Sequence, residues 1–148
     1  MILCNYHITP DGMHPIARLA ARMEATKERS SGRYPTDRER AKIRRAADTA
    51  ICGAIARHVR DMLAATLEGY PLLQAARLHH LEIAVSCTYQ APSFELTIAA
   101  PWDGEITQRA ADELRALLWN TLHTCTTYEQ TCKPFRDWLA ALPEKLPA

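Results

Sequence analysis

Histidine and cysteine are the residues of this chain best suited to metal or redox chemistry. The 148 residues include six histidines and five cysteines. The closest groupings are Cys4 with His7, the adjacent His79 and His80, and His123 with Cys125. Zinc sites in proteins are typically built from paired Cys-x-x-Cys or His-x-x-x-His spacings, and neither pattern occurs here. The sequence therefore predicts no metal site, and an odd number of scattered cysteines is typical of reduced thiols in a cytoplasmic protein.

Catalytic groups are equally hard to find in the sequence. A nucleophilic cysteine needs a neighbouring base and an electropositive setting. Cys87 instead falls on the apolar side of a predicted strand. Asp103 and Glu105 suit the start of a helix better than acid–base catalysis. The five glycines are isolated, so no phosphate-cradling loop or nucleophile elbow is present. We predict no catalytic residue and no cofactor, and an enzyme of unknown reaction is the third-ranked hypothesis.

A basic segment, residues 27–45, is the strongest single feature. It carries eight cations and three acids in a chain whose formal net charge is only +1. Clustered Arg and Lys side chains can contact phosphates and release counterions, so the segment favours nucleic-acid binding as the alternative function. Tyr34 lies within the segment and could stack on a base. The predicted contact residues are Lys27, Arg29, Arg33, Arg38, Arg40, Lys42, Arg44 and Arg45.

A protein–protein interface is the other hypothesis, and the one ranked first. The helix predicted over residues 36–67 has an apolar sector and, opposite it, a sector of small residues that would permit close approach of another helix. Tryptophans are enriched at interfaces, and two of them are candidate anchors. The leading expectation is a non-enzymatic binding or regulatory domain that self-associates. The candidate interface residues are Thr49, Cys52, Gly53, Ala56, Trp102 and Trp119.

The elements that must position these residues follow from hydrophobic periodicity. Alternating apolar residues predict a strand over residues 2–8 and an antiparallel hairpin over 81–98. Helical spacing predicts further elements near 13–29, 36–67, 105–125 and 131–142.

Local signals mark the helix ends. Gly32 is predicted to end the first helix in a left-handed conformation. Thr36 and Glu39 form a capping box at the start of the second. Because residues 36–45 carry cations on all sides of the helix, we expect that end to project beyond the body of the domain.

Together these elements predict one α+β domain spanning 1–148. It has two layers: an antiparallel hairpin, with the N-terminal strand as a candidate third member, packed by about four helices in the order βααββαα. Residues 30–35 are expected to be a flexible linker and 143–148 a frayed tail. No apolar run approaches the roughly 20 residues of a membrane span, so a soluble, cytoplasmic, bacterial-type protein without a membrane partner is expected.

Overall fold

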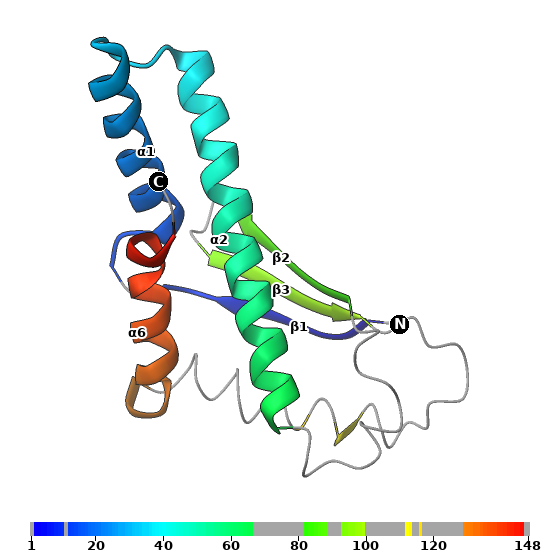
Figure 1. Cartoon of the computed structure of the whole chain (residues 1–148). Helices are drawn as coiled ribbons and strands as arrows, with labels where there is room; N and C mark the ends of the chain where they lie inside the picture. The colour runs from blue at the N-terminus through cyan, green and yellow to red at the C-terminus, as the bar shows by residue number, and fades with distance from the viewer. Residues whose placement is uncertain are drawn as a thin grey trace.

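A computed structural model describes residues 2–10, 12–66, 82–88, 93–99, 112–113, 116 and 129–146. The described elements follow the predicted α+β order (Figure 1). Residues 112–113 and 116 are helical, but the rest of the helix predicted over 105–125 lies outside the described residues. The elements are β1 (Ile2–Ile8), α1 (Pro15–Ser31), α2 (Asp37–Thr66), β2 (Glu82–Thr88), β3 (Ser93–Ala99) and α6 (Glu129–Lys145).

The three strands form one antiparallel sheet in the order β1-β3-β2. The predicted hairpin is confirmed, with Val85 opposite Leu96 and Cys87 opposite Phe94. The N-terminal strand is the third member, since Ile8 pairs with Phe94 across β1 and β3. Alternation places Phe94, Leu96 and Ile98 on one face, where all three are fully buried.

Helices cover that apolar face of the sheet and leave the other face bare within the described residues. The core joins β3 to Ile16 and Leu19 of α1 and to Ile51 and Ile55 of α2. α6 packs beside α1 and α2 (Figure 1). On the opposite face, the exposed Asn5 Nδ2 donates a hydrogen bond to Glu95 Oε1 at 2.8 Å. The result is the predicted two-layer arrangement.

The predicted caps fix the connection between α1 and α2. Gly32 ends α1 with φ +71°, and its N–H donates to the Glu28 carbonyl at 2.8 Å. The Glu39 N–H donates to Thr36 Oγ1 at 3.3 Å, as a capping box requires. In a complete capping box the Glu39 carboxylate would accept from the Thr36 N–H, but here it binds Arg33 instead. α1 also runs two residues beyond its predicted end at Arg29.

Residues 21–46, called the arm below, extend beyond the sheet (Figure 1). The buried hydrophobic core stops at Ala20 in α1 and resumes at Ala47 in α2. Between them, Pro35 is buried, and Met23 and Ile43 are half-buried. The expected projection of residues 36–45 is therefore observed, with the second half of α1 packed alongside them.

α6 differs from its predicted limits at both ends. It begins at Glu129, two residues before the predicted start at 131, and continues past the predicted end at 142 to Lys145. Two arginines of α1 support the extended end: Arg18 Nη2 donates to the Ala140 carbonyl at 2.6 Å and Arg22 Nη2 to the Leu146 carbonyl at 3.4 Å. These two bonds tie the C-terminal part of α6 to α1.

No helix of the described part is apolar enough over a sufficient length to cross a membrane.

Candidate nucleic-acid interface

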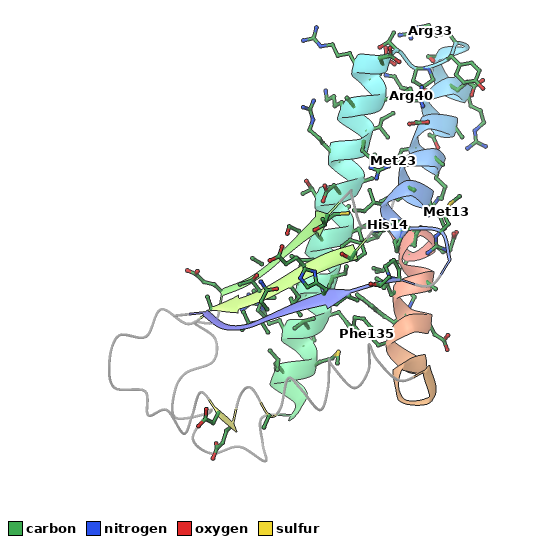
Figure 2. The ribbon with its side chains drawn as sticks, turned by 180° about the vertical axis from the view of Figure 1, so that it is seen from behind. Met13, His14, Met23, Arg33, Arg40 and Phe135 are labelled. Carbon is green, nitrogen blue, oxygen red and sulfur yellow. The ribbon has the colours of Figure 1, made fainter. Side chains whose placement is uncertain are left out.

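The eight predicted contact residues all lie on the arm. Lys27 and Arg29 occupy the last turns of α1, and Arg33 lies in the connecting loop at the tip (Figure 2). The other five lie in the first turns of α2. Because α1 and α2 run side by side, cations up to 18 positions apart in sequence lie on one projecting arm.

Three of the eight are engaged within the arm or at its base. Arg33 Nη2 forms an ion pair with Glu39 Oε1 at 2.7 Å, and this hydrogen bond holds the pKa of Glu39 below its ordinary value. Arg40 Nε lies 3.6 Å from Glu24 Oε1, which links α2 to α1. These contacts offset the repulsion between cations and hold the two helices together, so these two arginines are less available to a ligand.

Arg44 is the third engaged cation, and it lies where the arm meets the sheet. It is half-buried, and burial of His14 at the start of α1, together with the charge of Arg44, lowers the pKa of His14. Its partial burial, and not its position along α2, separates it from the exposed Arg45 that follows it.

The remaining five, Lys27, Arg29, Arg38, Lys42 and Arg45, are exposed. Within the described part of the chain none of their side chains forms an ion pair. Arg38, Lys42 and Arg45 have i, i+4, i+7 spacing, which places them within about 60° of one another around α2 and over about 10 Å of its length. We call these three residues the basic stripe.

A hollow between α1 and α2 offers a less suitable anion site. It has a volume of about 410 Å³ and is lined largely by alanines. A second hollow of about 230 Å³ shares Ala21, Glu24 and Arg40 with it. Arg40 and Arg44 also line the larger hollow, but the carboxylates of Glu24 and Asp37 balance their charge, so the lining has no excess positive charge to attract a phosphate. The exposed basic stripe is therefore the better candidate.

The residues of the small-residue sector of α2 differ in their exposure to solvent. Cys52 is 8% exposed, and its thiol donates to Asp48 Oδ1 at 3.1 Å. Thr49 is exposed, while Gly53 and Ala56 are half-buried. A Cβ on Gly53 would meet only Arg57 Nη1, at 3.5 Å, within the described residues. Self-association through this sector stays a prediction. The proposed anchors Trp102 and Trp119 lie outside the described residues.

A histidine–cysteine contact at the base of the arm was not predicted from the sequence. His14 Nε2 lies 3.6 Å from Cys87 Sγ, and the imidazole packs on Phe94 with ring centroids 4.6 Å apart. Its Nδ1 accepts from the Ile16 N–H at 3.3 Å and so caps α1. In the sequence, the position of His14 directly before Pro15 could have indicated that it caps the helix, since proline favours the first position of a helix.

This contact does not make a nucleophile in the described geometry. Burial lowers the pKa of His14 and raises the pKa of the Cys87 thiol, so neither group charges readily near neutral pH. A catalytic thiolate needs the opposite shifts. Burial and the bond to Asp48 raise the pKa of Cys52 to about 12, which makes that thiol inert as well.

Metal ligation has no support in the described part of the chain, where no group of three or more potential ligands is arranged to hold an ion. His79, His80, His123 and Cys125 lie outside the described residues. The described chain is thus an α+β domain with a projecting basic arm. Comparisons with protein-family models, with curated proteins and with solved structures found no match.

Proposed function

We propose that this protein is a non-enzymatic binding domain that uses its arm to bind nucleic acid through the phosphate backbone. The observation that carries the proposal is the basic stripe, in which Arg38, Lys42 and Arg45 line one exposed face of α2 without acidic partners in the described residues. Like charges at i, i+4 spacing destabilise a helix by a few tenths of a kcal/mol. A bound polyanion would remove that repulsion.

Other uses of an exposed basic face are less well supported. A membrane-surface helix combines cations with large apolar side chains on its other face. The residues around the basic stripe are instead small or polar, including Ala46 and Thr49, and the large apolar side chains of α2 are directed into the core. An acidic protein partner needs no linear array of cations. Phosphates repeated along a strand match a stripe about 10 Å long.

The salt dependence of binding gives the proposal a quantitative form. Each phosphate neutralised contributes roughly 0.7 to the slope of log K against log salt for a single strand, and roughly 0.9 for a duplex. Removing two such contacts should therefore reduce the slope by about 1.5. A charge that acts only through the overall field would change the affinity with little loss of slope.

The decisive experiment compares two matched double variants by fluorescence anisotropy with labelled oligonucleotides, over about 50 to 200 mM salt. Arg38→Gln/Arg45→Gln removes two cations of the basic stripe. Arg57→Gln/Arg60→Gln removes two exposed cations from the far half of the same helix. Both pairs replace Arg by a residue of similar helix propensity, so circular dichroism should show both folded.

The first variant should lose more than about tenfold in affinity and about 1.5 in slope. The control should bind within about twofold of the unmodified protein. Equal losses in both variants would point to a non-specific charge effect. No salt-dependent binding by the unmodified protein, to single strands or to duplexes, would end the proposal.

A further inference from the structure

An exposed tyrosine stands at the tip of the arm. Tyr34 is 80% exposed, and Met13, 65% exposed, is the other large hydrophobic residue exposed in the described part of the chain. Among the described residues, the phenol of Tyr34 forms no hydrogen bond and its ring makes no contact with another ring. Its ring therefore plays no part in the core that holds this region of the protein together.

The backbone that carries Tyr34 is nonetheless held on both sides. Before it, Gly32 closes α1 in the left-handed conformation. After it, Pro35 is buried. The Tyr34 carbonyl accepts from Arg33 Nη1 at 3.3 Å, and the same guanidinium pairs with Glu39 at 2.7 Å. The ring is thus presented from a defined loop, which lowers the entropy lost when it contacts a ligand.

Cations lie on both sides of this ring in the sequence. Lys27 and Arg29 lie in the last turns of α1, and Arg38 starts the basic stripe four residues after Tyr34. Proteins that bind single strands without sequence preference combine a positive surface that follows the backbone with aromatic rings that stack on the bases. In a duplex the bases are already stacked on one another, so an exposed ring finds no free face along its length.

We infer that Tyr34 stacks on an unpaired base and that the ligand of the arm is single-stranded nucleic acid. This inference rests on the proposed function and narrows it. The basic stripe supplies affinity for any phosphate backbone. The tyrosine adds affinity only where a base face is available, and it does so without selecting a particular base, because every base offers a π-face.

The test uses three ligands of matched length, about 12 nucleotides. They are a single-stranded oligonucleotide, an abasic single strand with the same phosphates, and a duplex. Three variants are compared in the full-length protein: Tyr34→Ala, Tyr34→Phe and, as the control at the other exposed hydrophobic residue, Met13→Ala. Because both positions are exposed, circular dichroism should show all three variants folded.

Tyr34→Ala should weaken binding of the base-containing single strand by about tenfold and leave its affinity for the abasic strand and its salt slope unchanged. Tyr34→Phe should bind as the unmodified protein does, since the ring and not the hydroxyl makes the contact. Met13→Ala should also be silent. The unmodified protein should prefer the base-containing strand to both other ligands.

Two failures can be told apart. If the unmodified protein binds all three ligands equally and Tyr34→Ala is silent, the stacking inference is wrong while the proposed function stands. An equal loss on the abasic strand in Tyr34→Ala would also overturn the inference. If no ligand binds with salt dependence, or if Arg38→Gln/Arg45→Gln binds normally, the proposed function itself is wrong.

Discussion

Protonation of His14 should weaken the start of α1. In the described state Nδ1 accepts from the Ile16 N–H at 3.3 Å, so the proton of the neutral ring is on Nε2, 3.6 Å from Cys87 Sγ. A second proton on Nδ1 would place two donors against each other. Burial lowers the pKa of His14, with a further lowering from Arg44 and an opposing effect from Asp48. The folded protein therefore resists this protonation.

The direction of the pH dependence follows from that shift. Because the pKa of His14 is lower in the folded chain than its ordinary value of 6.5, the unfolded chain binds more protons just below that pH. The contribution of His14 is fully present above about pH 6.5 and is lost as the pH falls through the folded pKa. A helix N-cap contributes about 1 kcal/mol, which sets the scale of the loss.

Urea unfolding at about pH 8 and about pH 5 measures this loss, with His14→Asn as the test variant. Asparagine keeps a capping acceptor but does not titrate. The free energy of unfolding should fall by about 1 kcal/mol more in the unmodified protein than in His14→Asn. His7→Asn, on the exposed outer face of the sheet, is the matched control and should retain the full pH dependence. Identical pH dependence in the unmodified protein and His14→Asn would refute the assigned role.

Four further predictions concern stability and reactivity. Leu96→Ala, at a fully buried position of β3, should lower the free energy of unfolding by about 3 kcal/mol in urea titrations. Gly32→Ala should cost about 1 kcal/mol through its positive φ alone, because nothing lies within 4 Å of the added Cβ. Gly53→Ala, inside α2, should instead raise the melting temperature. Cys52, with its pKa raised to about 12, should resist alkylation at about pH 8 until the protein unfolds, as peptide mapping by mass spectrometry would show.

The regular elements were predictable because they depend on local signals. Apolar residues alternate with polar ones at Phe94, Leu96 and Ile98, and this pattern identifies the buried face of β3 without knowledge of the neighbouring elements. Gly32 and Thr36 mark helix ends through their own conformational and hydrogen-bonding properties. The predicted end of α6 was wrong because it does not depend on local signals alone. The bonds that hold this part of the helix come from arginines more than a hundred residues away in the sequence.

The basic segment was predicted as a set, but its division into engaged and exposed cations was not. Glu39 was expected to complete a capping box with Thr36, whereas its carboxylate binds Arg33 from the preceding loop. Glu24 reaches Arg40 because α1 and α2 lie side by side, a fact of tertiary packing. The role of His14 was missed for the same reason, because Cys87 and Phe94 approach it only when the sheet forms.

The division among the cations explains how an arm with so little buried core can project from the sheet. Between Ala20 and Ala47 the one buried residue is Pro35. Half-buried side chains such as Met23 and Ile43, together with the ion pairs Arg40–Glu24 and Arg33–Glu39, therefore hold this region together. Exposed ion pairs each contribute little, typically under 1 kcal/mol. The arm therefore has less buried apolar surface to stabilise it than the part of the fold that packs on the sheet. A ligand that neutralises the basic stripe would stabilise the arm as it binds, which couples its order to occupancy.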